Sequence, residues 1–102
     1  MRLISFRQIR AWSRKYPDAR AALHRWYTIA EESEWNDIQE VRRIFPTADA
    51  VGVRSGRITT VFNIRGNNYR LITAIHYNTK RIYLLRFLTH GEYDDNSWKG
   101  DS

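Results

Sequence analysis

The strand-like segment Leu84–Leu88 runs directly into four side chains that can hold or move a proton, namely His90, Glu92, Tyr93 and Asp94. A histidine has an unperturbed pKa of about 6.5, so it can accept or donate a proton near neutral pH. A tyrosine, with a reference pKa near 10, suits a hydrogen-bond donor or an acid better than an unaided base. A loop that only closed a sheet could use almost any polar residues. The segment therefore predicts a site of proton transfer, with His90 as the first candidate.

Arg70 stands inside a second mainly apolar segment, residues 69–77. Its guanidinium stays charged at any working pH and presents a planar fork of donors that suits phosphate. A phosphate-binding cation beside a proton-transfer group fits the cleavage of RNA. There a base takes the proton of the 2′-hydroxyl, cations stabilise the phosphorane, and an acid protonates the leaving 5′ oxygen. The structural alternatives are that Arg70 covers apolar surface with its stem and that His90 holds the end of the strand together.

A β-sheet is expected to position these residues. After Pro46 the apolar residues recur with a period of two, and Gly66-Asn67 is typical of a hairpin turn. In that register Asn63 faces Arg70, and a slip by one residue would bury Arg70. The face that must then pack on helices carries Ile58, Phe62, Ile64, Leu71 and Ile75.

The second hairpin is expected to turn at Asn78-Thr79 and to continue into a strand over residues 81–88. In that register Asn68 faces Thr89 and Arg70 faces Phe87. Arg70 and His90 would then lie at the same end of the sheet, as a shared site requires.

Before Pro46 the apolar period is that of helices. Ser5 predicts the start of a first helix that Pro17 ends, residues 17–30 form a second, and residues 37–44 form a third with Asn36 as its cap. Leu3-Ile4 fits a short edge strand. The fold class is therefore α+β, with N-terminal helices packed on an antiparallel β-meander. A chain of 102 residues predicts one domain over 1–102, with 95–102 as a flexible tail.

Seventeen Lys and Arg against eleven Asp and Glu give a formal net charge of +6, and residues 50–91 contain no acid. This block indicates a polyanion partner on one face. Besides the catalytic candidates, we expect the substrate to be bound by polar and charged residues at or near the ends of the strands, namely Asn63, Arg65, Asn68, Lys80, Arg81, Glu92 and Asp94.

The composition also argues against several classes of protein. With no cysteine, the chain has no disulfide and no thiol nucleophile. Its three histidines are scattered, so we expect no metal site and no cofactor. No run approaches about 18 apolar residues, and the amino terminus turns polar too early for a signal peptide. We therefore expect a cytoplasmic protein without membrane contact.

Three motifs resemble the signatures of HigB-type toxins, which belong to the RelE/ParE superfamily of type II toxin–antitoxin systems. They lie at residues 62–64, 66–72 and 88–94, and shorter matches occur at 16–18, 26–27 and 45–46. The resemblance implies a RelE-like fold and ribosome-dependent cleavage of mRNA, which inhibits translation. It also implies a HigA-type antitoxin with a helix-turn-helix domain, so that DNA would be bound only through that partner.

Residue by residue, Arg70 matches the strand arginine that RelE-like toxins use on the scissile phosphate. His90 and Tyr93 fall where such toxins place C-terminal catalytic groups. One departure is that the family often has a basic residue immediately before the position of Arg86, where this chain has Leu85. If Arg86 lies on the helix side of the sheet, part of the expected cationic cluster is missing.

Two other functions remain open at this stage. A ParE-like toxin shares the fold and inhibits DNA gyrase, but it would not need His90 and Tyr93 beside Arg70. A non-catalytic RNA-binding module would explain the charge, yet it would normally carry stacking aromatics on the exposed sheet face. That face is expected to present Asn63, Arg70 and His76 instead.

Overall fold

The computed structural model describes residues 1–4 and 6–100, so the expected cap at Ser5 lies outside the described residues. A five-stranded sheet with the order β1-β5-β4-β3-β2 forms the centre of the protein. Its strands are β1 (Arg2–Ile4), β2 (Asp49–Gly52), β3 (Ile58–Ile64), β4 (Tyr69–His76) and β5 (Arg81–Thr89). The helices are α1 (Phe6–Lys15), η1 (Pro17–Ala19), α2 (Arg20–Glu32), α3 (Ile38–Ile44), α4 (His90–Asp94) and η2 (Ser97–Gly100).

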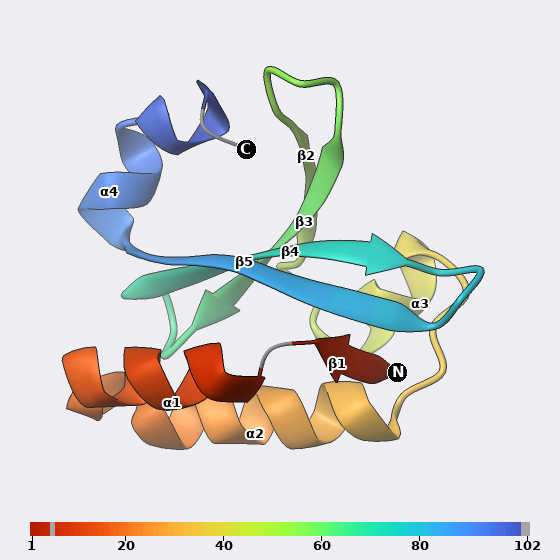
Figure 1. The fold of residues 1–102 in the computed structure, drawn as a ribbon, viewed down its shortest axis with the longest axis horizontal. Coiled ribbons are helices and arrows are strands. Elements are labelled where there is room, and N and C mark those ends of the chain that lie inside the picture. The colour runs from red at the N-terminus through yellow and green to blue at the C-terminus, as the bar shows by residue number, and fades with distance from the viewer. Residues whose placement is uncertain (5, 101–102) are drawn as a thin grey trace.

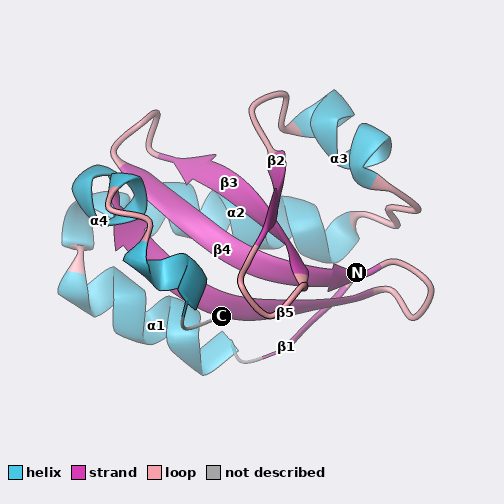
Figure 2. Ribbon diagram, turned by 90° about the horizontal axis from the view of Figure 1, so that it is seen from above, coloured by secondary structure: helices cyan, strands magenta, loops and turns pink. Residues whose placement is uncertain are grey.

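The sheet separates two sets of helices. In Figure 1, α1 and α2 cover the lower face, while α4 and η2 lie over the upper face. The edge strand β1 runs parallel to β5, and every other neighbouring pair is antiparallel. Figure 2 shows β1 at one margin of the sheet and β2 at the other. The expected α+β fold with a short N-terminal edge strand is therefore confirmed.

The main core lies between the sheet and the α1–α2 layer, where apolar side chains of both layers meet. Phe62 on β3 and Leu71 on β4 are fully buried there. The Phe62 ring contacts Trp26 of α2 edge-on at 5.1 Å between centroids and stacks on Trp35 at 6.3 Å. Such large apolar side chains contribute most of the burial energy of a small domain, so this face holds the helices in place.

The helix boundaries follow the sequence signals with two corrections. Pro17 stops α1, as expected, but the single helix expected over residues 17–30 is divided into the short 3₁₀ helix η1 and the α-helix α2. The cap of α3 is Asp37, whose side chain accepts a hydrogen bond from the Glu40 amide, so the expected cap Asn36 was wrong. Asn36 instead donates its backbone amide to the Glu40 carboxylate, and its side-chain oxygen accepts from Lys80.

The first hairpin has the expected register, with Asn63 opposite Arg70 and Ile64 opposite Tyr69. The second hairpin differs by one residue at its far end, because Arg70 pairs with Leu88 and Thr89 pairs with Tyr69. The expected pairings of Arg70 with Phe87 and of Asn68 with Thr89 were therefore wrong.

A β-bulge causes this difference. On β4, Thr73 pairs with Leu84 and Ile72 pairs with Arg86, so Leu85 is an extra residue on β5. A bulge of this kind bends its strand and increases the local twist. All pairs beyond it are displaced by one position relative to a regular hairpin.

Ile58 is a second correction. It was expected to pack on the helices, but it is 62% exposed. Ile58 begins β3 and pairs with Gly52 of the edge strand β2. In Figure 1 the β2–β3 hairpin projects upward, away from the α1–α2 layer, in agreement with the exposure of Ile58.

A smaller core lies on the opposite sheet face. Trp98 of η2 is 3% exposed, packs with Val61 and Ile72, and donates its indole N–H to the Tyr93 carbonyl at 3.1 Å. Residues 95–102 were expected to form a flexible tail, whereas residues 97–100 form η2 with its tryptophan buried, and residues 101–102 lie outside the described part. The apolar face beneath the indole ring explains the difference, because burying such a ring orders the segment that carries it. None of the described helices has the length and apolarity needed to cross a bilayer.

Candidate active site

Arg70 is held at the end of β4 by its own hairpin. Its Nη1 donates to the backbone carbonyl of Asn67 at 2.9 Å and to that of Tyr69 at 3.2 Å. Both bonds are donated by Nη1, so the second terminal nitrogen, Nη2, can contact another group. The β3–β4 turn thereby fixes the guanidinium at the end of the sheet, where β5 leads into α4.

His90 is the first residue of α4, and a capping box fixes the start of that helix. The Thr89 side chain accepts from the Glu92 amide, and the Glu92 carboxylate accepts from the Thr89 amide at 2.9 Å. The His90 amide donates to the Asn68 carbonyl at 3.0 Å, which joins α4 to the β3–β4 turn. The carboxylate of Glu92 therefore organises the backbone that carries His90.

The His90 ring bridges a cation and an anion. The Nη2 of Arg70 lies 3.3 Å from Nδ1, and the Asp94 Oδ2 lies 2.9 Å from Nε2. A guanidinium can only donate, so Nδ1 must be the acceptor and the ring proton must reside on Nε2. The neighbours of His90 thus select the tautomer whose basic nitrogen faces the guanidinium.

Tyr93 lies on the other side of the same guanidinium, with the Arg70 Cζ 5.4 Å from the centre of its ring. The Tyr93 ring stacks on Trp98 at 5.3 Å between centroids. Burial raises the pKa of the Tyr93 phenol, the carboxylates of Asp49 and Asp94 raise it further, and the charge of Arg70 opposes them. Tyr93 is therefore a neutral hydroxyl donor at physiological pH.

The bulge determines the side of the sheet on which Arg86 lies. Paired residues of an antiparallel ladder point to the same side, and Arg86 pairs with Ile72, which belongs to the Trp98 core. Arg86 therefore lies on the sheet face that carries Arg70 and α4, not on the helix side. In a regular strand without the bulge, Leu85 would pair with Ile72, and the Arg86 side chain would point to the helix side of the sheet.

The remaining candidates are divided between the two ends of the sheet. Asn63 donates its side-chain amide to the Asn67 side chain, close to Arg70, and Asn68 contributes its carbonyl to His90. Arg65 in the same turn forms an ion pair with Asp18 at 3.1 Å. Lys80 and Arg81 are not part of this group, since they lie at the β4–β5 turn at the opposite end of β4.

Lys80 is already engaged at its own end of the sheet. Its Nζ donates to the Trp35 carbonyl at 2.9 Å and to the Asn36 side chain at 2.5 Å. The structure thus brings together Arg70, His90, Tyr93 and Asp94, which belong to two segments of the chain. Among the described residues, no group of three or more His, Asp or Glu could hold a metal ion.

Trp98 contributes to the site, although the sequence analysis assigned it to a tail. Its ring stacks on the Tyr93 ring, and its indole N–H donates to the Tyr93 carbonyl. The only signal in the sequence was a tryptophan in a polar segment, five positions beyond a tyrosine of the site. The side of the sheet on which Arg86 lies could not be predicted for a different reason. It depends on a bulge among leucines, and nothing in the sequence indicates that bulge.

Comparison with known proteins shows the family of this chain. A family model described as HigB_toxin, the RelE-like toxic component of a toxin-antitoxin system, matches residues 19–96. The chain belongs to the HigB toxin family. The match covers the elements from α2 to α4 and thus every residue of the Arg70–His90–Asp94 group.

Relatives of nearly full length carry the same family name. The mRNA interferase HigB of Escherichia coli O6:H1, strain CFT073, is 33% identical over 92% of this chain and 89% of its own. The mRNA interferase toxin HigB of Escherichia coli K12 is 23% identical over 92% of this chain and 88% of its own. The mRNA interferase HigB of Shigella flexneri matches to the same extent. The expected resemblance to HigB-type toxins is confirmed, and the ParE-like alternative is not favoured.

Proposed function

We propose that this HigB-family toxin is an endoribonuclease that cleaves mRNA without a metal ion and thereby inhibits translation. The observation that carries the proposal is the continuous contact from Arg70 through His90 to Asp94, at 3.3 Å and 2.9 Å. In the proposed mechanism, Arg70 is the phosphate-binding cation, His90 the proton acceptor and Asp94 the carboxylate that orients the ring, and these contacts support that assignment. The names of the relatives, mRNA interferases, support the same substrate.

Binding of the scissile phosphate would activate His90. When a phosphate oxygen takes the Nη2 of Arg70, the Nδ1 of His90 loses its donor and becomes free to accept the proton of the 2′-hydroxyl. The resulting imidazolium keeps its bond to Asp94, now as an ion pair. The 2′ oxygen attacks phosphorus, the bond to the 5′ oxygen breaks, and a 2′,3′-cyclic phosphate remains.

Tyr93 is the proposed donor to the leaving 5′ oxygen. A departing alkoxide is a stronger base than a phenolate, so this proton transfer is downhill even though the pKa of Tyr93 is raised. Arg70 stabilises the negative charge of the phosphorane from the adjacent position, and Arg86 adds positive charge on the same sheet face. Each role falls to a residue whose side chain is held by the fold.

The ribosome would supply the geometry that this small site lacks. The side chains of His90 and Asp94 are 53% and 58% exposed, so the site is an open surface. Positioning of a bound substrate lowers the barrier substantially, and mRNA held in the ribosomal A site would arrive already ordered. We assign Asn63, Arg65 and Asn68 to the mRNA near the scissile phosphate. Lys80 and Arg81 could reach only RNA that extends along the sheet to its other end.

A toxin of a toxin–antitoxin system has an antitoxin as its partner. We propose that this antitoxin is of the HigA type, that it covers part of the basic surface between residues 50 and 91, and that toxin and antitoxin act in the cytoplasm. The toxin would then meet DNA only through the antitoxin.

The test is a cleavage assay with a defined mRNA, purified toxin, and ribosomes present or absent. We expect cleavage that needs ribosomes, resists EDTA at concentrations that leave the ribosomes intact, and disappears with Arg70→Ala. Products should end in a 2′,3′-cyclic phosphate or its hydrolysis product. Arrest of DNA gyrase without any loss of mRNA would overturn the proposal in favour of a ParE-like activity.

A further inference from the structure

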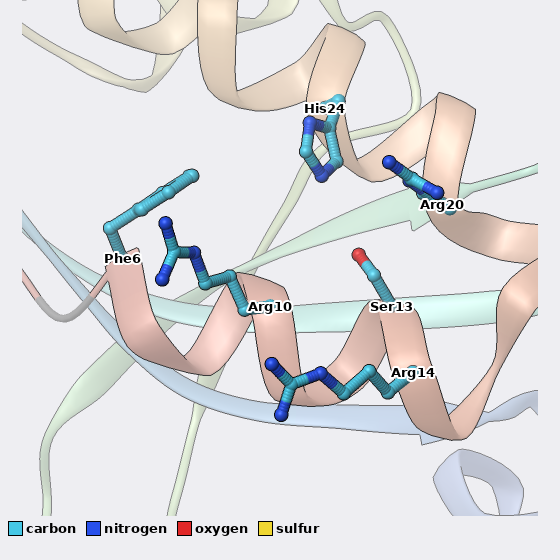
Figure 3. A pocket seen from close by; sticks show the side chains of 6 residues that line it. All are labelled: Phe6, Arg10, Ser13, Arg14, Arg20 and His24. Atoms are coloured by element: carbon cyan, nitrogen blue, oxygen red, sulfur yellow. The ribbon is translucent and has the colours of Figure 1, made fainter.

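A groove of about 390 Å³ lies between α1 and α2, on the opposite side of the sheet from α4. It plays no part in the chemistry proposed for His90. Figure 3 shows side chains of both helices around it. The groove is lined by Phe6, Arg10, Ser13, Arg14, Arg20 and His24.

The groove is cationic and has no counter-ion of its own. Within the described residues, Arg10, Arg14 and Arg20 form no ion pair. Asp18 is the only acid in residues 1–25, and it is engaged by Arg65 and Tyr69. The same 25 residues contain seven cations, which are Arg2, Arg7, Arg10, Arg14, Lys15, Arg20 and Arg25. The Arg10 guanidinium lies over the Phe6 ring, with its Cζ 5.7 Å from the ring centre, but this contact leaves its charge unneutralised. Like charges that gather without a counter-ion attract an anion.

Ser13 provides an independent sign of a ligand. Its side chain is 8% exposed, and its Oγ has no hydrogen-bond partner. Figure 3 shows this oxygen pointing from α1 into the groove, toward the helix that carries Arg20 and His24. Buried hydroxyl groups in proteins are nearly always hydrogen-bonded, and this oxygen exposes less than 1 Å². An acceptor that enters the groove and moves the neighbouring side chains apart would satisfy a group that the chain leaves unpaired.

The donors suit phosphates better than a single carboxylate. One arginine fork satisfies a carboxylate, whereas three forks and a hydroxyl exceed what its two oxygens need. Arg10 and Arg14 are one helical turn apart, so they point along the same side of α1 and can follow successive phosphates of a chain. The Phe6 ring at the end of the groove is 38% exposed, and it holds the Arg10 guanidinium over its face.

We propose that the α1–α2 groove binds the phosphate backbone of an RNA segment other than the one that is cut. The sheet separates the groove from Arg70 and His90, so one short stretch of RNA cannot occupy both. Ser13 donates its hydroxyl to one phosphate oxygen, and the three arginines neutralise that phosphate and its neighbours. The protein thus has two RNA-binding surfaces, one for chemistry and one for docking.

The experiment measures binding of a short fluorescein-labelled RNA hairpin to the purified toxin by fluorescence anisotropy at several salt concentrations. Arg14→Gln and Arg20→Gln should each weaken binding about tenfold and lower the slope of log K against log salt by about one. Ser13→Ala should weaken binding about threefold with the slope unchanged. It should not lower the Tm, because the hydroxyl makes no bond in the free protein.

Arg7→Gln is the matched control, since Arg7 is an exposed arginine of the same helix that does not line the groove. If the groove variants weaken hairpin binding no more than Arg7→Gln, the inference is overturned. Two further ligands, each tested by direct binding, identify the source of the anion. Variant-sensitive binding of a labelled polyglutamate peptide, with no binding of the hairpin, would make the groove a protein-docking surface. Variant-sensitive binding of inorganic phosphate alone would restrict it to free phosphate, and either result contradicts the proposal.

Discussion

The Nη2 of Arg70 lies 3.3 Å from the Nδ1 of His90, so the group that would bind the phosphate also covers the basic nitrogen of the proton acceptor. In the free protein this contact keeps Nδ1 occupied. Substrate binding at Arg70 would release it. The order of events in the proposed reaction follows from this contact, and the first three predictions test it.

Replacing Arg70 with alanine should reduce cleavage by at least about 10²–10³-fold, because it removes a preorganised donor to the developing oxyanion. Arg70→Lys should recover only part of the activity, since an ammonium lacks the fork. Arg43→Ala, which removes an equal charge from the exposed surface of α3, is the control. Growth arrest by Arg70→Ala at equal expression would show that the site is wrongly assigned.

Replacing His90 with glutamine should lower single-turnover cleavage by about 10²–10⁴-fold, the usual contribution of a general base. Asp94→Asn should cost less, about tenfold to a hundredfold, because solvent can partly replace an exposed carboxylate. Both rates are measured with ribosomes in excess, alongside Tm on the same preparations. A lower Tm with an unchanged rate for His90→Gln would mean that the ring only holds the loop together.

Replacing Tyr93 with phenylalanine should slow cleavage by about 10²-fold while the ring still stacks on Trp98. The cause is loss of the proton donor to the 5′ oxygen. A substrate with a bridging sulfur at that position needs no proton, because a thiolate leaves readily. The variant and the natural protein should therefore cleave this substrate at similar rates, and an equal defect on both substrates would exclude Tyr93 as the acid.

Alkaline conditions should destabilise the fold through Tyr69. Its hydroxyl donates to Asp18 at 2.8 Å, and this bond, followed by burial and the charge of Asp18, raises its pKa while Arg65 opposes the rise. A pKa raised in the folded state contributes stability that is complete below the unfolded pKa of about 10. That stability is lost as the pH rises through the folded value. Urea titrations between pH 9 and 12 should show the decline, and Tyr69→Phe should make it shallower. An identical pH profile for the variant would contradict this assignment.

Association with the antitoxin should slow as the salt concentration rises. The acid-free stretch from residue 50 to residue 91 gives the toxin a basic surface, and opposite charge on a partner accelerates encounter at low ionic strength. Stopped-flow measurements over a range of salt concentrations check this. A rate constant that does not depend on salt would indicate that the antitoxin binds through apolar surface instead.

Local patterns predicted the part of the site that lies in the first hairpin. Gly66-Asn67 and strict alternation fix the pairing of Asn63 with Arg70, because any slip would bury a charge and expose Phe62. Periodicity and Pro17 likewise located the two long helices. These features are encoded within a few residues of where they act.

The register of the second hairpin and the position of the C-terminal segment depend on tertiary contacts that no local sequence pattern predicts. The extra residue Leu85 is apolar like its neighbours, so neither composition nor alternation reveals the bulge. Burial of Trp98 depends on an apolar surface formed by β3 and β4, more than 20 residues away in the sequence. Exposure of Ile58 depends on where the helix layer ends. Each outcome was decided by tertiary packing.

The bulge at Leu85 also bears on how the length of this strand could change in related chains. A one-codon deletion that removed Leu85 would leave Thr73 opposite Leu84 and Ile72 opposite Arg86, so no pair in the ladder would have to change partner. The strand would lose the added twist at this point and the contact of the Leu85 side chain with the Trp98 core. Such a deletion would preserve the strand pairing and alter the angle at which α4 leaves the sheet. The presence or absence of a residue at Leu85 would therefore change the position of His90 while the domain keeps its fold.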